Sequence, residues 1–189
     1  MTKTRLSSAP GALDQGRRRL LKWSAGALAA ELTTARVADA VPAERRLAFY
    51  NTHTDESLSV VYRVGADYVA ESLAEIDRLL RDHRTDEVHA MDMRLLDLLH
   101  ALSTLLHARA AFHVISGYRS PTTNTVLASM NGGVAARSLH MAGKAIDIRL
   151  PGVDLRQLRT AAVALRGGGV GYYAQSDFVH IDVGHLRYW

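Results

Sequence analysis

A histidine and a carboxylate at close spacing are the residues of this chain most suggestive of metal chemistry. His140 precedes Asp147 by seven positions, and a second histidine, His180, lies in the apolar run Phe178–Asp182. Two imidazoles and one carboxylate are a common ligand set for a catalytic zinc ion, whose fourth position is left for water. Spacing alone leaves two alternatives open, namely a surface loop histidine at 140 and a structural core histidine at 180.

Two short strands and one loop would have to bring these side chains together. Residues 145–150 and 178–182 are rich in apolar and β-branched types and predict strands. Because side chains alternate along a strand, His180 and Asp182 share one face. If the two strands pair in one sheet, Asp147 can lie beside His180, with His140 on the preceding loop. Such a site is rigid and open, as a catalytic metal requires.

The remaining chain predicts helices first and strands later. Apolar residues recur at helical spacing in the first half, and short β-like runs with hairpin-like links fill the end. This order favours an α+β fold with a small antiparallel sheet packed against helices. The glycines at 167–171 predict a close approach of backbone to a neighbouring strand or to substrate. Further strands are expected at 46–51, 58–63, 112–116 and after the glycine run, and helices at about 66–81, 91–107, 122–130 and 155–165.

Composition limits the class of protein. The 189 residues suffice for one domain with a substantial core, and 48% hydrophobic residues exclude a disordered chain. The formal charge of +4 comes from residues 1–40, because the remainder holds 16 basic and 16 acidic side chains. The charge is therefore no argument for a nucleic-acid partner, and none is expected. With no cysteine, disulfides and thiolate metal ligands are excluded.

The N-terminal segment has the layout of a secretory signal. The basic stretch Arg17–Lys22 precedes the apolar run Trp23–Ala30, and Ala38 and Ala40 offer small residues for a signal peptidase. The apolar run is too short to span a bilayer as a helix. The arginine pair resembles a twin-arginine export signal, although glycine and leucine replace the more usual serine and phenylalanine beside it.

This layout divides the chain into an export signal at 1–40 and a mature domain at 41–189. The expected partner of the signal is the twin-arginine export machinery, and the expected location is the periplasm. The alternative is an ordinary basic signal sequence. In either case no stable membrane span is expected in the mature form.

Three longer motifs carry a resemblance to a known group of enzymes. They are S-G-Y-R-S-P-x-x-N at Ser116–Asn124, S-x-H-x-x-G-x-A-x-D at Ser138–Asp147 and G-G-V-G-Y-Y…F-V-H-I-D-x-G at Gly168–Gly184. In this order they resemble the zinc murein peptidases, the group that includes lysostaphin-type enzymes, D-Ala-D-Ala peptidases and hedgehog domains. The murein endopeptidase K type is the most similar, over essentially the whole chain.

The resemblance implies a fold, a cofactor and an activity. The fold would be hedgehog/D-Ala-D-Ala-peptidase-like, and one Zn²⁺ per chain would be held by His140, Asp147 and His180. The activity would be that of a zinc endopeptidase hydrolysing peptide cross-links of peptidoglycan. The alternatives are a D,D- or L,D-carboxypeptidase acting on stem peptides, a catalytically silent zinc domain that binds cell-wall peptide, and an exported structural domain without metal.

The implied site offers more than one candidate for the general base. The resembling enzymes have a histidine two residues before the last ligand or a glutamate three residues before it. Phe178 occupies the first position and cannot accept a proton. Asp177 occupies the second with a shorter carboxylate, but a regular strand would turn it away from His180. Asp182 is the rival base, or a partner that holds a ligand's N–H. Further candidates for the base are His113 and His185.

Arg119 is the predicted contact to the reacting part of the substrate. Its planar guanidinium can bind a carboxylate or polarise a carbonyl, and in the resembling enzymes an arginine of this kind contacts substrate near the zinc. The alternative is a surface arginine at a turn. Ser138 could bind substrate or turn its loop. Three tyrosines could contact substrate or pack in the wall of the site: Tyr118, Tyr172 and Tyr173.

Overall fold

The computed structural model describes residues 42–131, 135 and 137–189, which belong to one compact unit. The predicted export signal at 1–40 lies outside the described residues. No helix within the described part of the chain has the length and apolar character needed to cross a membrane.

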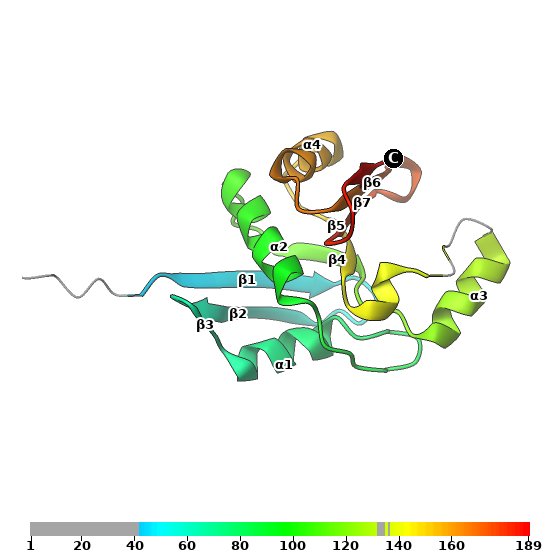
Figure 1. Ribbon diagram of the computed structural model, residues 1–189, viewed down its shortest axis with the longest axis horizontal. Coiled ribbons are helices and arrows are strands. Elements are labelled where there is room, and N and C mark those ends of the chain that lie inside the picture. Colours follow the sequence, from blue (N-terminus) through cyan, green and yellow to red (C-terminus); the bar gives the residue numbers. More distant parts are fainter. Residues whose placement is uncertain (1–41, 132–134, 136) are drawn as a thin grey trace, which may run out of the picture. The chain divides into compact units, whose positions relative to one another are not determined.

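One sheet of eight strands forms the centre of the unit, in the order β3-β2-β1-β4-β5-β7-β6-β8 (Figure 1). The α+β class is therefore confirmed. The sheet is larger than expected and is mixed, because β1 pairs with β4, and β6 with β8, in parallel. The strands are β1 (Glu44–Asn51), β2 (Ser57–Val64), β3 (Asp67–Tyr68), β4 (Phe112–Ser116), β5 (Ala145–Arg149), β6 (Gly169–Tyr173), β7 (Phe178–Asp182) and β8 (Arg187–Tyr188).

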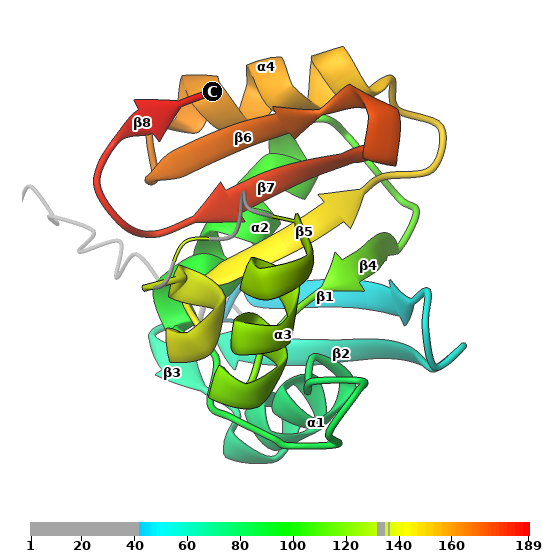
Figure 2. The same ribbon diagram turned by 90° about the vertical axis from the view of Figure 1, so that its right-hand side faces the viewer.

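The helices flank this sheet on two sides. In Figure 2, α2 and α4 lie behind the strands and α3 stands in front of them. The first helix is shorter than the expected 66–81, because Asp67–Tyr68 pairs with β2 as a separate strand. The helices are α1 (Ala70–Leu79), α2 (Met93–Leu105), α3 (Pro121–Asn131) and α4 (Leu155–Leu165), and two short 3₁₀ turns are η1 (Leu139–Ala142) and η2 (Ala174–Ser176).

The alternation of side chains gives β5 and β7 two different faces. Ile146 and Ile148 of β5 are fully buried in the hydrophobic core, and so are Val179 and Ile181 of β7. Burial of such side chains contributes about 1.5–3 kcal/mol each. The intervening polar residues must then point to the opposite face of the sheet. The core thus fixes which side chains these strands present to the candidate site. The leucines of α2 in the same core are Leu95, Leu96, Leu99 and Leu102.

Candidate metal centre

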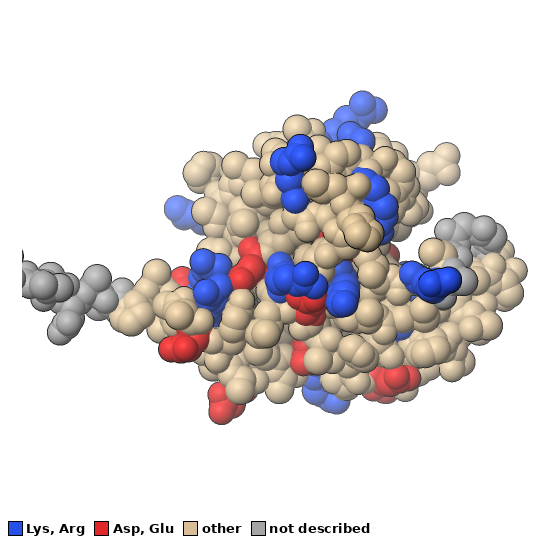
Figure 3. Space-filling model, viewed as in Figure 1, with Lys and Arg blue, Asp and Glu red and all other residues tan. Residues whose placement is uncertain are grey.

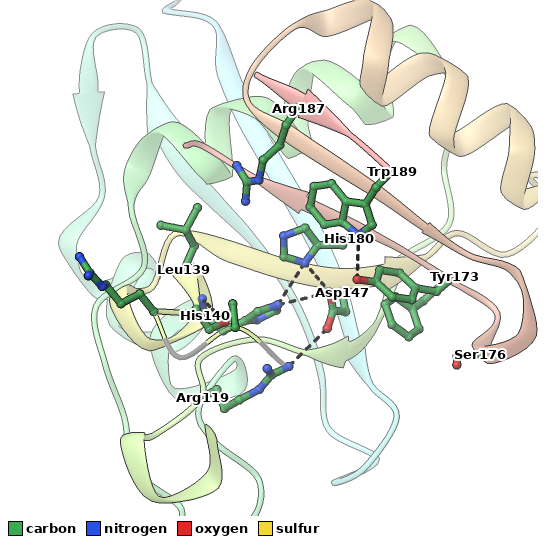
Figure 4. A pocket seen from close by; sticks show the side chains of 13 residues that line it. Arg119, Leu139, His140, Asp147, Tyr173, Ser176, His180, Arg187 and Trp189 are labelled. Carbon is green, nitrogen blue, oxygen red and sulfur yellow. Dashed lines mark hydrogen bonds and ion pairs between the residues drawn. The ribbon is translucent and has the colours of Figure 1, made fainter. Parts of the chain in front are cut away.

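The structure brings His140, Asp147 and His180 together. Asp147 and His180 are direct partners in the antiparallel β5–β7 pair, and His140 reaches them from η1 (Figure 4). His180 Nδ1 lies 2.8 Å from Asp147 Oδ1, and His140 Nε2 lies 3.2 Å from His180 Nδ1 and 3.3 Å from Asp147 Oδ1. One potential ligand atom from each residue lies within 4.8 Å of the other two. The sequence-based expectation that strand pairing joins Asp147 to His180 is confirmed.

A short capped turn positions His140. Ser138 precedes η1, and its Oγ accepts a hydrogen bond from the His140 backbone N–H. Gly143 ends the turn with φ of 63°, a left-handed conformation that glycine adopts without strain. A β-carbon at this glycine would collide with the Ala90 carbonyl. The motif residues on both sides of His140 therefore shape the loop that delivers it.

The outer ring nitrogens of both histidines are held by acceptors. His140 Nδ1 lies 2.7 Å from the Gly117 carbonyl oxygen, and His180 Nε2 lies 3.0 Å from Asp182 Oδ2. Because a carbonyl or carboxylate oxygen only accepts, these nitrogens carry the ring hydrogens. His140 Nε2 and His180 Nδ1 then carry no hydrogen, and their lone pairs face Asp147. Three electron-pair donors at this separation repel each other unless a proton or cation lies between them, so the donor set fits a metal ion.

The pKa shifts at the centre favour the charged forms of its residues. Burial alone would lower the pKa of His180, but the carboxylates of Asp147 and Asp182 raise it to about 9. Burial alone would raise the pKa of Asp147, yet its pKa is lowered by His140 and His180. Asp147 and His180 thus stabilise the charged forms of each other.

Asp182 is a buried anchor behind His180 rather than a group facing substrate. Its side chain is fully buried and accepts hydrogen bonds from the backbone N–H groups of Gly169 and Gly184, at 3.1 and 2.8 Å. Arg187 donates to both carboxylate oxygens, at 2.6 and 3.2 Å. Burial alone would raise the pKa of Asp182, but the hydrogen bonds from His180, Gly184 and Gly169 lower it to about 2. Asp182 therefore fixes the His180 ring, and its saturated oxygens leave no site for a reacting proton.

The glycine run at 167–171 leaves room for groups that a side chain would collide with. A β-carbon at Gly168 would meet the Asp182 backbone carbonyl, and one at Gly169 would meet the Asp182 carboxylate. A β-carbon at Gly171 would lie 2.6 Å from the indole ring of Trp189. The expected close approach of backbone is confirmed, and the groups that approach are the anchor of His180 and the last residue of the chain.

A cavity of about 610 Å³ opens beside the metal centre. Arg119 reaches it from the segment after β4, with its NH2 atom 3.6 Å from Asp147 Oδ2 and 3.3 Å from Ser116 Oγ. Its Nε atom is buried without a hydrogen-bond partner among the described residues. The residues that line the cavity are Arg119, Ala135, Arg137, Ser138, Leu139, His140, Asp147, Tyr173, Ser176, Phe178, His180, Arg187 and Trp189.

A second hollow of about 600 Å³ adjoins the first and shares Leu139 and Arg187 with it. It is lined by further cations, including Arg94 and Lys144. Basic side chains also gather in the middle of the face seen in Figure 3, around the start of α2. The surroundings of the centre are therefore predominantly cationic.

Several predicted site residues lie away from the cavity. Asp177 ends η2 with φ of 52°, and its exposed carboxylate lies 2.9 Å from Arg149. Tyr118 is buried, and its hydroxyl donates to Glu87 at 2.7 Å, which makes it part of the supporting wall. His113 of β4 packs against Tyr50 of β1, with the ring planes tilted by 54°, and His185 lines the second hollow. Among the described residues that line the main cavity, no carboxylate or imidazole is present besides the three clustered ones.

Arg187 and Trp189 line the cavity but lie outside the motifs that the sequence singles out. Arg187 holds Asp182, and the Trp189 ring lies 5.4 Å from the His180 ring, measured between centroids. Both come from the last three residues, which form β8 and its end. The only feature of the sequence that points to these two residues is the glycine run. It indicates that some group packs closely against it but does not identify that group.

Comparisons with known proteins identify the family of the chain. The family model described as peptidoglycan L,D-endopeptidase MepK matches residues 39–189. The chain is similar to peptidoglycan L,D-endopeptidase MepK of Escherichia coli K12, with 40% identity over 178 residues, 93% of this chain and 98% of the relative. It is also similar to the probable peptidoglycan L,D-endopeptidase MepK of Haemophilus influenzae, with 39% identity over 180 residues, 94% and 97% of the two chains. The matched region contains every residue of the metal centre.

Proposed function

Because the chain belongs to the peptidoglycan L,D-endopeptidase MepK family, we propose that it is a zinc-dependent endopeptidase that hydrolyses peptide cross-links of peptidoglycan. The observation that carries the proposal is the convergence of two lone-pair ring nitrogens and one carboxylate oxygen beside an open cavity. The same three residues are the ligands implied by the motifs.

His140 Nε2, Asp147 and His180 Nδ1 are the proposed zinc ligands, one ion per chain. When bound, zinc lowers the pKa of a coordinated water toward neutrality and polarises a carbonyl oxygen. Gly117 and Asp182 hold the two rings from behind, so the ligand geometry is set before any ion arrives. Such outer partners typically contribute 10- to 100-fold in metal affinity.

Arg119 is the proposed donor to the substrate beside this centre. Its guanidinium reaches the cavity next to Asp147, and its buried Nε lacks a partner among the described residues. A carbonyl that gains negative charge during hydrolysis would give this group a stronger acceptor than it has otherwise. Arg119 thus favours the transition state over the bound substrate, which is the requirement for catalysis.

The charge of the cavity favours an anionic peptide as substrate. Arg119, Arg137 and Arg187 line it, and Arg94 and Lys144 line the adjoining hollow. A cationic cleft raises the local concentration of a peptide that carries free carboxylates. Ser138 lies at the same wall and is a proposed substrate contact.

A second candidate function is a catalytically silent zinc domain that binds cell-wall peptide. It is favoured by Phe178 at the position where related enzymes place a base, and by the lack of a free carboxylate or imidazole among the described cavity residues. A carboxypeptidase that trims stem peptides would use the same centre with a different peptide position.

The proposed location is the periplasm. The basic and apolar pattern of residues 1–40 supports export, and its arginine pair supports the twin-arginine route. The names of the relatives identify peptidoglycan as their substrate, and a peptidoglycan endopeptidase must reach the wall to act.

Digestion of purified murein separates these functions. Zinc-loaded protein is incubated with murein, and the released fragments are separated by chromatography, with the Asp147→Asn variant as the matched control. Loss of cross-linked dimers in the wild type alone supports the endopeptidase. Shortened monomers support the carboxypeptidase. Unchanged fragments, with zinc bound to the protein, would favour the binding domain instead.

A further inference from the structure

Tyr173 presents a hydroxyl to the metal centre. It is the last residue of β6 and lines the cavity. Its ring stacks on Phe178 with centroids 4.6 Å apart and planes 21° from parallel. Figure 4 shows the hydroxyl end of the ring turned toward His180 and Asp147. The aromatic ring is therefore wall packing, while the oxygen at its tip faces the place where substrate would react.

Trp189 determines which way the hydroxyl hydrogen can point. The indole Nε1–H lies 2.9 Å from Tyr173 Oη. Because an indole nitrogen only donates, the tyrosine oxygen is the acceptor in this bond. The hydroxyl hydrogen is then available for a different partner, and no hydrogen bond donated by Tyr173 occurs among the described residues. An unused donor thus faces the cavity.

Trp189 is itself firmly held. Its backbone N–H donates to the Val170 carbonyl at 3.2 Å, and its carbonyl accepts from the Tyr172 N–H at 2.9 Å. The Arg187 guanidinium lies 5.1 Å from the indole centroid, a favourable cation–π distance. The space for the ring exists because residue 171 is glycine. The donor that orients Tyr173 is consequently fixed by the sheet.

We propose that the Tyr173 hydroxyl is a catalytic hydrogen-bond donor to the oxygen of the scissile carbonyl, and that Trp189 is its positioning residue. This inference rests on the proposed peptidase function. During hydrolysis the water oxygen bonds to the carbonyl carbon, the C–N bond breaks, and both water protons end on the leaving nitrogen, which gives a carboxylate and an ammonium. Tyr173 keeps its proton throughout and only stabilises the negative charge that develops on the carbonyl oxygen.

Tyr173 complements Arg119 rather than duplicating it. In Figure 4 the two side chains approach the cluster from different sides, Arg119 from the segment after β4 and Tyr173 from β6. Two donors on different sides can bind both lone pairs of one carbonyl oxygen. Removal of one hydrogen-bond donor to a developing oxyanion typically costs about 10²–10³ in kcat.

The Tyr173→Phe variant tests the hydroxyl alone, because phenylalanine keeps the stacking on Phe178. Steady-state kinetics of the zinc-loaded full chain on a purified cross-linked muropeptide dimer should show kcat reduced about 10²-fold, with KM nearly unchanged and zinc content equal to wild type. The matched control is Tyr172→Phe. Tyr172 is the preceding residue in β6, so its side chain takes the opposite face, where its ring lies 5.9 Å from Arg159. This control should behave as the wild type.

Trp189→Phe tests the positioning role, since it keeps an aromatic ring beside His180 but removes the N–H donor. We expect Trp189→Phe to lower kcat less than Tyr173→Phe does. Adding Trp189→Phe to Tyr173→Phe should lower kcat no further. The ¹H–¹⁵N resonance of the Trp189 indole should also move in Tyr173→Phe, because its acceptor is gone. An active wild type with an equally active Tyr173→Phe variant would overturn this inference alone, as would a loss confined to KM. A zinc-loaded wild type that cleaves nothing would overturn both the proposed function and the inference about Tyr173.

Discussion

Asp182 Oδ2 lies 3.0 Å from His180 Nε2, on the side of the imidazole opposite Asp147. His180 is thus held between two carboxylates, one at the cavity and one in the interior. The inner carboxylate is bound in turn by Arg187, which belongs to the last strand. The orientation of a proposed zinc ligand therefore depends on a carboxylate and an arginine that supply no ligand atom themselves.

Asp182→Asn should weaken zinc binding without removing a ligand. The amide is neutral and is a weaker acceptor for the His180 N–H, so we expect a 10- to 100-fold loss of affinity, with activity regained in excess zinc. Competition with a chromogenic chelator measures this directly. The control is Asp177→Asn, which alters only an exposed pair with Arg149 and should keep wild-type affinity and activity. An Asp182→Asn protein of unchanged affinity would contradict the anchoring role, and an inactive Asp177→Asn protein would identify Asp177 as the base.

Arg119→Met should impair catalysis while zinc stays bound. The side chain lies near Asp147 Oδ2 at 3.6 Å, yet it contributes no ligand atom, so the metal content should not change. Loss of a donor to the developing charge should lower kcat about 10²–10³-fold. Arg119→Lys should recover only part of the rate, because an ammonium lacks the planar fork. Kinetics and metal analysis on the same preparations provide the test, and a fall in zinc content that parallels the rate would argue against a catalytic role.

The cluster could be predicted from the sequence because the motifs at Ser138–Asp147 and Gly168–Gly184 imply its three residues as one set. Asp147 and His180 lie on strands whose alternation is visible in the apolar pattern, and the pairing of neighbouring antiparallel strands brings them together. Contacts that no motif specifies could not be placed. Tyr118 turns away because its hydroxyl bonds to Glu87, 31 positions earlier, and periodicity contains no information about such a contact. Asp177 is displaced by a left-handed backbone conformation that a strand pattern does not reveal.

The pairing of strands in the sheet could likewise be predicted only in part from the sequence. The parallel pairing of β1 with β4 joins strands separated by two helices, and local patterning does not specify such long-range partners. The last three residues were missed for a different reason. Arg187 and Trp189 belong to a two-residue strand and its end, which is too short to produce a period. Their importance follows from the space left by Gly169 and Gly171.

His83 should make the fold less stable below neutral pH. It stacks on His53 with ring centroids 3.8 Å apart, and burial, followed by the charge of His53 and Arg84, lowers the pKa of His83 to about 4. In the unfolded chain its pKa is about 6.5. As pH falls from about 6.5 to 4 the unfolded state takes up a proton that the folded state does not, so the free energy of unfolding decreases.

Urea unfolding of wild type and His83→Gln at pH 7.5, 5.5 and 4.5 measures this contribution. The wild type should lose more stability than the variant across this range. Other titrating groups, His180 among them, are common to both proteins, so the difference isolates His83. Equal losses in the two proteins would show that the stacked pair does not resist protonation.

Gly171→Ala should destabilise the end of the sheet. The added β-carbon would lie 2.6–2.8 Å from atoms of the Trp189 indole, so the ring or the strand must move. Overpacking of this kind costs about 1–3 kcal/mol, which chemical denaturation can resolve. In a Trp189→Ala background the same substitution should cost much less, because the obstructing ring is gone. An equal cost in both backgrounds would mean that the glycine is required for another reason.

Zinc content per chain tests the central claim most directly. Elemental analysis of the purified full chain should find one zinc in the wild type and essentially none in His140→Ala, which removes the ligand that η1 delivers. His185→Ala, which removes a histidine of the adjoining hollow, should keep its zinc. A His140→Ala protein that retains a full equivalent of zinc would contradict the proposed zinc site. A zinc-free wild type that still cleaves murein would contradict the proposed zinc dependence.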